Sequence, residues 1–501
     1  SEARTKSSTI IYKEQKKKEV RTMKSFTEKK AEIEDYKPYA AYEAVRKFPV
    51  LEGYLHHFSQ TSMMNEIPGL LSFFFIQGQV ALPYVRIPTG DSHLDPRVHV
   101  FWIQPSRTGK SIAWNFISEI MERINVPYDS FASGTDAGLI GSTNAVLDDN
   151  HKPTGEYETI PGLLSGRKAI NFDEGSILLT PNKHSQETVL YLQTACNAVG
   201  SNSNILVKHM KGNKIESESA VSLWITTYPP KGVKDYVLTK GIFQRVLLYW
   251  AHWDMGMRQE VSNTRLGTFW QRPEESDLTK DDVCDYFDET QKRLQDRLRN
   301  FAEIPWSVWD EMNDEDREAL VQHHMWDMFK PGLNYTKSLR NASERIYEQL
   351  VKMNPTMSEI VASFTPGIEN YLGIISLHMA LLDKSWEIKS EHVGMADEIL
   401  FDLFKNLVSW LEDSVEVNGN KAKEGKLLEQ MLKAYNDCVG YEIQGRSGEW
   451  RRKKLVLNKY TEVNGVSMST AERHFKDYAS KMFNIRKQGK WIYYQHKAAK
   501  K

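Results

Sequence analysis

Short runs of β-branched and aromatic residues alternate with helical patterns in this 501-residue chain, and this alternation constrains its fold more than any other feature. The run "VHVFWIQ" (98–104) precedes "SIAWNFISEIMERI" (111–124), whose apolar residues recur at helical spacing. Strand-like runs follow at "KAINFDE" (168–174) and "AVSLWITTYPP" (220–230). Alternating strands and helices imply a mostly parallel sheet. We therefore expect an α/β fold here.

The turn after the first of these strands, "QPSRTGKS" (104–111), has the composition of a phosphate-binding loop. In such a loop the backbone N–H groups and the positive end of a helix dipole face the phosphates. Gly109 allows close backbone approach, Lys110 reaches the β- and γ-phosphates, and Ser111 offers a hydroxyl to Mg²⁺. Gln104 stands where such loops usually begin with glycine, a milder departure than losing Gly109 or Lys110. The predicted nucleotide-binding residues are Pro105, Ser106, Arg107, Thr108, Gly109, Lys110 and Ser111.

The strand "KAINFDE" ends in Asp173 and Glu174, about 60 residues after Lys110. Either feature alone is weak, because a Gly-Lys-Ser run arises by chance and an acidic pair often marks a solvated turn. The presence of both features within one block of alternating strands and helices favours a nucleotide site. Asp173 would hold Mg²⁺ through water, and Glu174 would orient and polarise the attacking water. The expected cofactors are therefore ATP and Mg²⁺.

The segment "ILVKHMKGNKIE" (205–216) has the pattern of a β-hairpin with a Gly-Asn turn at 212–213. Its cationic candidates are Lys208, His209, Lys211 and Lys214. Lysine contacts phosphate without regard to base sequence, which suits a protein that grips any nucleic acid strand. An exposed basic turn without a ligand has the same pattern, so this segment alone does not decide its role.

The chain ends are basic, although the formal net charge is −1. Residues 451–501 carry 14 Lys and Arg against three acids, which favours contact with a polyanion. There "SMSTAERHFKDYASKM" (467–482) predicts a capped helix, and "FNIRKQGKWIYYQ" (483–495) predicts two strands around a Gln-Gly-Lys turn. This order indicates a winged-helix-like module, which binds nucleic acid or packs on protein. Its candidate phosphate contacts are Arg473, Lys476, Arg486, Lys487 and Lys490.

Composition argues against several classes of protein. With 40% hydrophobic and 26% charged residues and no apolar run of spanning length, the chain is not expected to enter a membrane. Its first residues lack the apolar segment of a secretory signal. Cys196, Cys284 and Cys438 lie far apart, so neither a disulfide framework nor a zinc site is expected. A reducing cytoplasm fits these observations best.

Changes of composition divide the chain into five expected parts. Residues 1–37 lack apolar periodicity and carry 11 Lys and Arg against seven acids, as in a solvated arm. The later boundaries fall near the turn "PTGDSHLDP" and the break "EVNGNKAKEG". The parts are a basic arm without stable structure (1–37), an N-terminal helical region (38–90), an ATPase core (91–270), a helical lid or insert (271–420) and a basic winged-helix-like module (421–501).

The segment "ASGTDAGLIGSTNAVLDDNHKPTGEYETIPGLLSGRKAINFDEGS" (132–176) resembles the corresponding part of the minichromosome-maintenance-type AAA+ helicases. Phage- and plasmid-encoded replicative helicases of the same wider group are similar. The resemblance continues through 192–230, through "GIFQRVLLYW" (241–250) and, more weakly, through 367–400. It spans about 300 residues in ordered motifs. It implies an AAA+ P-loop NTPase core of the group that carries a hairpin before its first sensor, with helical N-terminal and lid regions.

The resemblance also implies roles for single residues. Arg245 matches the arginine that completes the site of a neighbouring subunit, where a cation stabilises transition-state charge; an arginine that merely pairs at a helix-to-strand junction is the alternative. Thr227 matches the γ-phosphate sensor, with Thr226 and Tyr228 as alternatives. In such helicases the hairpin projects into a central channel.

Together these features predict an ATP-driven, ring-forming helicase or translocase, most simply a hexamer, that acts on single-stranded DNA during the replication of a phage or other mobile element. Forked or duplex DNA and a primase or polymerase are further expected partners. The alternative is an ATP-switched initiator or loader that binds DNA without processive unwinding. The two differ in whether nucleic acid drives turnover of the motor.

Overall fold

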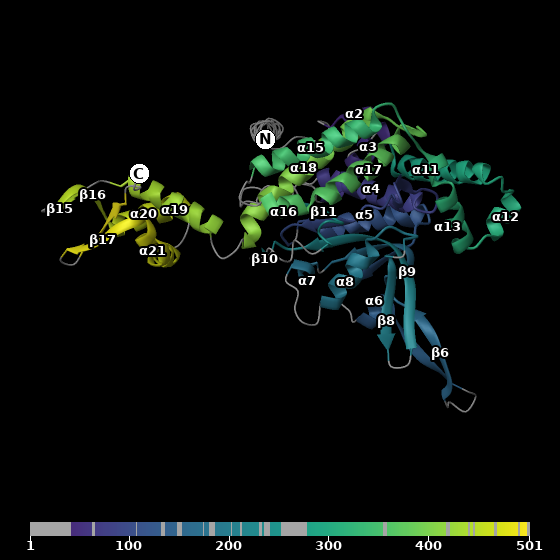
Figure 1. The fold of residues 1–501 in the computed structure, drawn as a ribbon, viewed down its shortest axis with the longest axis horizontal. Coiled ribbons are helices and arrows are strands. Elements are labelled where there is room, and N and C mark those ends of the chain that lie inside the picture. Colours follow the sequence, from purple (N-terminus) through teal and green to yellow (C-terminus); the bar gives the residue numbers. More distant parts are fainter. Residues whose placement is uncertain are drawn as a thin grey trace, which may run out of the picture.

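The computed structural model of the chain is drawn in Figure 1, and its described part has two hydrophobic cores. The first joins residues between Tyr42 and Leu411, and the second joins residues between Met431 and Tyr494. The described residues are 42–62, 66–106, 108–131, 136–147, 153–173, 175–179, 186–201, 203–210, 213–229, 233–234, 241–251, 278–353, 358–416, 421–438, 441–443, 446–464, 468–488 and 491–497.

A six-stranded sheet forms the centre of the large body. Five strands run parallel in the order β11-β3-β9-β7-β4, and β8 pairs antiparallel with β9. The expected mixed α/β fold with a mostly parallel sheet is therefore confirmed. The strands are β3 (Val100–Ile103), β4 (Tyr128–Phe131), β7 (Gly166–Phe172), β8 (Ile205–Met210), β9 (Asn213–Thr227) and β11 (Leu247–Trp250).

The direction of the connections reverses between the neighbouring strands β3 and β9. From β3 the chain passes through α5 (Lys110–Arg123) to β4 at one edge, whereas from β9 it continues to β11 at the other edge. In open parallel sheets, ligands bind outside the carboxyl ends of the strands at such a reversal. The loops after β3, β7 and β9 meet at this edge, so it is where a site is expected.

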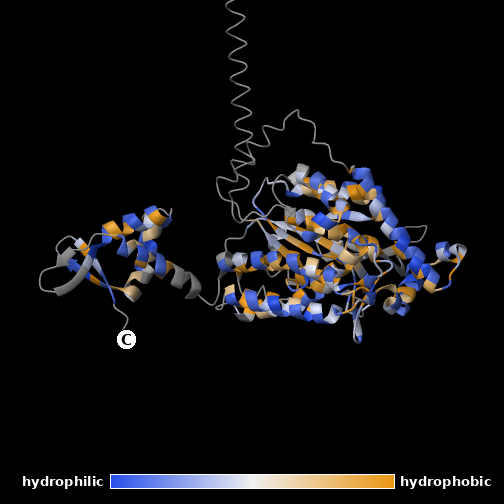
Figure 2. Ribbon diagram, turned by 90° about the horizontal axis from the view of Figure 1, so that it is seen from above, coloured by the Kyte–Doolittle hydropathy of each residue, from blue (hydrophilic) through white to orange (hydrophobic). Residues whose placement is uncertain are grey.

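Helices cover the sheet, and the most apolar of them is α4 (Glu66–Ala81). Its Phe73, Phe74 and Phe75 are fully buried, and it contacts α3 (Pro49–Ser62), α11 (Lys280–Phe301) and β3. Figure 2 shows hydrophobic residues along the central strands and alternation of hydrophobic and hydrophilic residues along the helices. The run "GLLSFFFIQ" is thus apolar on all sides because protein surrounds it. None of the described helices combines the length and apolar character needed to cross a bilayer.

The rest of the body consists of further helices that cover the sheet and of short strands, and it includes two hairpins. One hairpin is formed by β5 and β6, the other by β8 and β9, and both project from the sheet in Figure 1. These elements are α2 (Glu43–Lys47), β1 (Ile87–Thr89), β2 (Ser92–Leu94), α6 (Asp136–Ile140), β5 (Gly141–Leu147), β6 (Pro153–Pro161), α7 (Ser176–Leu179), α8 (Gln186–Ala195), β10 (Val233–Lys234), α12 (Trp306–Glu311), α13 (Asp314–His323), α14 (Met325–Met328), β12 (Lys330–Pro331), α15 (Tyr335–Met353), α16 (Ser358–Ser363), α17 (Thr365–Leu382), β13 (Glu387–Ile388), α18 (Ser390–Ser414) and β14 (Val415–Glu416).

The C-terminal module has its own core and a four-stranded antiparallel sheet in the order β15-β16-β18-β17. Phe475, Phe483 and Tyr494 stack at its centre. The predicted helix and the hairpin after it are confirmed as α21, β17 and β18, whereas the pairing of β16 with β18 was not predicted. Its elements are α19 (Lys421–Asn436), β15 (Tyr441–Ile443), β16 (Arg446–Arg452), α20 (Lys453–Asn464), α21 (Met468–Met482), β17 (Phe483–Gln488) and β18 (Trp491–His496).

Candidate functional site

The loop between β3 and α5 turns on Gly109, whose φ of 98° is in the left-handed region that favours glycine. Gln104 braces the start of this loop. Its buried side chain accepts a hydrogen bond from Trp102 Nε1 (2.8 Å) and donates one to the carbonyl oxygen of Thr108 (2.8 Å), while its backbone N–H donates to Thr227 (3.1 Å). Gln104 therefore ties the loop to itself and to β9, a role that the sequence pattern did not show.

The Lys110 side chain folds back over the loop. Its Nζ donates to the carbonyl oxygens of Gln104 (2.6 Å) and Pro105 (2.9 Å) and lies 4.7 Å from the centre of the Tyr228 ring. Burial lowers the pKa of Lys110 to about 8, against the opposing effect of the Asp173 carboxylate. A partly desolvated cation held by loop carbonyls is available to an anion of the right shape. Ser111 follows it and is exposed.

Asp173 lies directly after β7 at the same edge of the sheet and is exposed. Its Oδ1 accepts a hydrogen bond from Thr226 Oγ1 (2.7 Å), at the end of β9. The next hydroxyl, Thr227 Oγ1, is buried and has no hydrogen-bond partner among the described residues. A buried unpaired hydroxyl is costly unless a water or ligand satisfies it. The predicted residues Lys110, Asp173 and Thr227 thus meet at one edge, and Glu174 and Arg107 lie outside the described residues.

Strand β9 belongs to both the β8–β9 hairpin and the central sheet. Its first residues pair with β8, and its last residues pair with β3 and β7. The Gly-Asn turn predicted at 212–213 needs correction, because Asn213 already pairs with Met210 within the ladder. A connection of two residues is enough to close such a hairpin.

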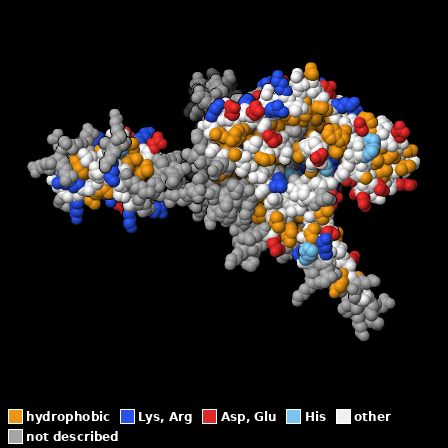
Figure 3. Space-filling model, in the orientation of Figure 1, with side chains coloured by type: hydrophobic (Ala, Val, Ile, Leu, Met, Phe, Trp, Pro, Cys, Tyr) orange, Lys and Arg blue, Asp and Glu red, His pale blue; other side chains and the backbone are white. Residues whose placement is uncertain are grey.

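The cations of this hairpin do not form one row. His209 lies opposite Lys214, whereas Lys208 lies opposite the buried Ile215. Directly paired residues share a face of the sheet, and neighbours in a strand point to opposite faces. His209 and Lys214 therefore share one face and Lys208 takes the other. Lys214 also forms an ion pair with Glu216, so positive and negative side chains mix on the projecting segment in Figure 3. Lys211 lies outside the described residues.

Arg245 precedes β11 and so lies near the amino-terminal edge of the parallel strands, opposite to the loop that carries Lys110. Its Nε donates to Asn197 Oδ1 (2.8 Å), and its Nη1 donates to the carbonyl oxygen of Gly241 (2.6 Å). Within one chain, Arg245 is therefore apart from Lys110 and Asp173 and is held by local contacts.

A buried ion pair fixes the segment that carries Asn197. Arg97 Nη2 contacts Asp95 Oδ2 at 2.7 Å, and the guanidinium also donates to the carbonyl oxygens of Ala195, Asn197 and Val221. Burial acts to raise the pKa of Asp95, but the charge and hydrogen bonds of Arg97, the charge of Arg86 and the N–H of Val199 together outweigh it and hold that pKa well below its usual range. These contacts join the end of α8 to the middle of β9, and so position both the hairpin and Arg245.

The predicted phosphate contacts of the C-terminal module divide between a helix and a strand. Arg473 and Lys476 are exposed on α21, and Lys487 is exposed on β17, where the neighbouring Arg486 is half-buried. Blue side chains mark this module in Figure 3. Lys490 lies outside the described residues.

No family model matches this chain, and a search of curated proteins found no match.

Proposed function

We propose that this protein is an ATP-dependent, ring-forming translocase or helicase of the AAA+ P-loop type that acts on single-stranded DNA in replication. The observation that carries this proposal is the continuity of β9. One strand of 15 residues bears Lys214 of the hairpin near its start and Thr226 and Thr227 of the candidate nucleotide site at its end. A rigid element shared by two sites is a physical means of coupling them.

The residues at the sheet edge suit a nucleoside triphosphate with Mg²⁺. Gly109 and the first N–H groups of α5 would cradle phosphate oxygens, and Lys110 would exchange its two loop carbonyls for the β- and γ-phosphates. Ser111 and Asp173 would hold Mg²⁺, which neutralises developing charge on the phosphates when bound. The unpaired Thr227 Oγ1 would contact the γ-phosphate or the attacking water. Glu174 is proposed as the residue that polarises this water.

The location of Arg245 supports action between subunits. It lies near the amino-terminal edge of the sheet, whereas the candidate nucleotide site lies at the carboxyl edge. An arginine there cannot readily reach Lys110 of its own chain, but in a head-to-tail ring it can face the site of the next subunit. We infer a closed ring, most simply a hexamer, with ATP hydrolysed at its interfaces.

Nucleotide binding is expected to take up protons at mildly alkaline pH. With a pKa of about 8, about half of the Lys110 side chains are neutral at pH 8, and phosphates favour the ammonium form. Binding of Mg²⁺·ADP should therefore take up about half a proton per site at pH 8 and much less at pH 7. Calorimetry in two buffers of different ionisation enthalpy measures this uptake. Absence of net uptake at pH 8 would contradict the proposed contact.

The hairpin provides the test of the proposed function. Replacing Lys208, Lys211 and Lys214 with alanine should reduce DNA-stimulated ATP hydrolysis and unwinding far more than basal hydrolysis, because the nucleotide residues remain intact. The plot of log affinity against log salt should also flatten by roughly 0.7 for each lost contact with single-stranded phosphate. The matched control is Lys352→Ala, which replaces an exposed lysine of α15. It should change neither the DNA-stimulated hydrolysis nor the salt dependence of DNA affinity.

The alternative function, an ATP-switched initiator or loader, predicts the reverse pattern. Removal of residues 417–501 leaves the first hydrophobic core intact, since its residues end at Leu411. A translocase shortened in this way should keep part of its DNA-stimulated hydrolysis. If the shortened protein loses all stimulation while the hairpin variant keeps it, the module is the main DNA contact and the translocase proposal is wrong.

A further inference from the structure

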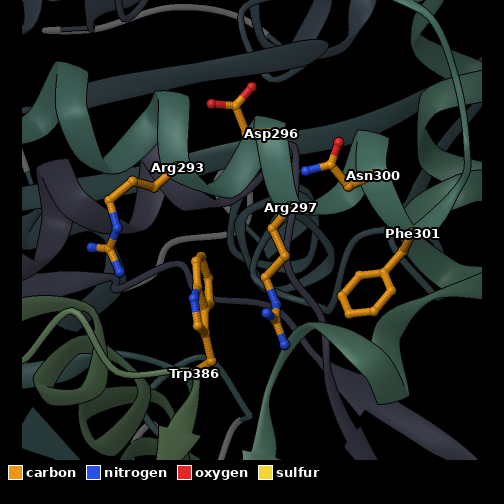
Figure 4. Close-up of a pocket in the computed structure, with 6 residues that line it drawn as sticks. All are labelled: Arg293, Asp296, Arg297, Asn300, Phe301 and Trp386. Atoms are coloured by element: carbon orange, nitrogen blue, oxygen red, sulfur yellow. The ribbon is translucent and has the colours of Figure 1, made fainter.

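A second candidate site lies on α11, away from the central sheet (Figure 4). It is a cavity of about 440 Å³ between one face of α11 and the connection from α17 to α18. This volume is within the range of sites that bind small ligands or a few side chains. Its lining residues are Arg293, Asp296, Arg297, Asn300, Phe301 and Trp386.

The wall of this cavity is a stack of alternating cations and aromatic rings. The guanidinium carbons of Arg293 and Arg297 lie 5.0 and 4.3 Å from the centre of the Trp386 ring, and Figure 4 shows the indole between them. Arg297 also lies 4.8 Å from the Phe301 ring, which stacks on His324. Stacking occupies the faces of each guanidinium and leaves its N–H edges for other partners.

Backbone contacts hold both arginines in place. Arg293 Nη2 donates to the carbonyl oxygen of Lys384 (2.9 Å), and Arg297 donates to the carbonyl oxygens of Met328 (2.9 Å) and Asp327 (3.0 Å). Each guanidinium has further N–H groups beyond those used in these bonds. The side chains are thus fixed before any ligand arrives, which lowers the entropic cost of binding.

Neither arginine forms an ion pair within the part of the chain that the structure describes. The nearby carboxylates have other partners: Glu289 pairs with Lys384 at 2.7 Å, and Asp296 lies 4.0 Å from Arg299. Two ordered guanidinium groups beside one cavity therefore lack a directly bonded carboxylate within the described residues, although the charges of Glu289 and Asp327 act on Arg293 and Arg297 from farther away. This arrangement fits an anionic ligand, and Arg binds carboxylate oxygens in a bidentate geometry.

The surroundings favour a peptide over nucleic acid. Residues 303–318, which follow α11, carry seven acids and one arginine, and Figure 3 shows red side chains at the end of the body formed by α12 and α13. This charge opposes an extended polyanion, which carries a charge at every nucleotide, more strongly than a segment with only two carboxylates. Apolar side chains are also exposed nearby: Trp326 is 58% exposed on α14, and Leu333 is 85% exposed after β12, which pairs with β13 beside Trp386. Exposed Trp and Arg with apolar neighbours are typical of protein-binding hot spots.

We propose that this cavity binds an extended segment of another protein that carries two acidic side chains two residues apart, flanked by apolar residues. Such side chains are roughly 7 Å apart along a strand. The guanidinium carbons of Arg293 and Arg297 lie 5.0 and 4.3 Å from the centre of the Trp386 ring between them, so the two carboxylates can reach both arginines. The two carboxylates contact Arg293 and Arg297, and the apolar residues pack near Phe301 and Leu333. This inference does not depend on nucleotide hydrolysis.

The test uses the full chain and a fluorescein-labelled peptide with the core Leu-Asp-Phe-Asp-Leu. The control peptide has asparagine in place of both aspartates. We expect the aspartate peptide to bind at least roughly tenfold more tightly, and the double variant Arg293→Gln, Arg297→Gln to lose this difference. The matched control is Lys292→Gln, an exposed lysine of the same helix, which should bind like the unmodified protein.

A second measurement needs no substitution. Phenylglyoxal modifies accessible arginines, and mass spectrometry should show that the aspartate peptide protects Arg293 and Arg297 while the asparagine peptide does not. Equal binding of the two peptides, or equal modification with either, would overturn the proposal. Displacement of the peptide by a thymidine oligonucleotide that itself requires both arginines would overturn it in favour of a nucleic acid surface.

Discussion

Lys110→Ala is expected to reduce ATP hydrolysis by a factor on the order of 10³ or more, because it removes the cation at the start of α5 that is proposed to contact the phosphates. Nucleotide affinity should fall as well. In the free protein the free energy of unfolding should fall by no more than a few kcal/mol. Lys110 donates to two carbonyl oxygens of its own loop, and a hydrogen bond from a charged group contributes about 1.5–3 kcal/mol, but burial of the ammonium opposes this gain. Steady-state phosphate release and nucleotide binding measure the two effects.

The matched control is Lys168→Ala, which removes a partly exposed lysine from β7 of the same sheet, where it pairs with Asp129. This variant should hydrolyse ATP like the unmodified protein. Glu174→Gln should differ from both, with ATP bound but not hydrolysed, because it removes activation of the water and leaves the phosphate contacts. Hydrolysis at the unmodified rate in Lys110→Ala would refute the assignment of the loop.

Arg245→Ala should lower hydrolysis roughly 10³-fold while nucleotide affinity stays nearly unchanged, the pattern expected of a cation that contacts transition-state charge from a neighbouring subunit. Mixing this variant with Lys110→Ala should restore part of the activity. In a mixed ring, some interfaces combine the intact Lys110 of one subunit with the intact Arg245 of the next. Hydrolysis measured across mixing ratios should pass through a maximum.

Exchange of subunits has to be established first, by native mass spectrometry of differently labelled variants. Arg245→Lys separates charge from geometry, because lysine keeps the cation but cannot reproduce the contacts to both Asn197 and Gly241. If mixed assemblies form and no ratio restores hydrolysis, Arg245 acts only within its own chain, as an arginine that pairs at a helix-to-strand junction.

Local patterns predicted the elements of the central sheet but not their arrangement. The runs at 98–104 and 168–174 correspond to β3 and β7 because β-branched and aromatic residues favour strands regardless of their neighbours. The order of the strands depends on pairing between distant segments, such as Leu247 with Val100, which no local pattern contains. The same limit applies to β9, where local patterns predict a hairpin arm and a separate sheet strand although the two form one strand.

The candidate sites show a similar limit. The sequence pattern placed Gly109, Lys110 and Asp173 at one candidate site because phosphate binding restricts residue types at short spacing, and their role in binding phosphate stays a prediction. The role of Gln104 was not, since it depends on the position of Trp102 and Thr108 around a buried amide. Arg293 and Arg297 show helical spacing in the sequence, but the ring between them comes from Trp386, far along the chain. Only the folded chain joins them.

The continuity of β9 also restricts how the hairpin can change in length. Lys214 and Thr226 are an even number of residues apart, so in a regular strand they share a face. Insertion of one residue between them would turn the lysine to the opposite side while Thr226 stayed beside Asp173. Insertion of two residues in each arm would keep Lys214 on the same face of the strand and lengthen the hairpin by roughly 7 Å. Its reach can therefore vary only in such steps, unless a bulge absorbs the odd residue.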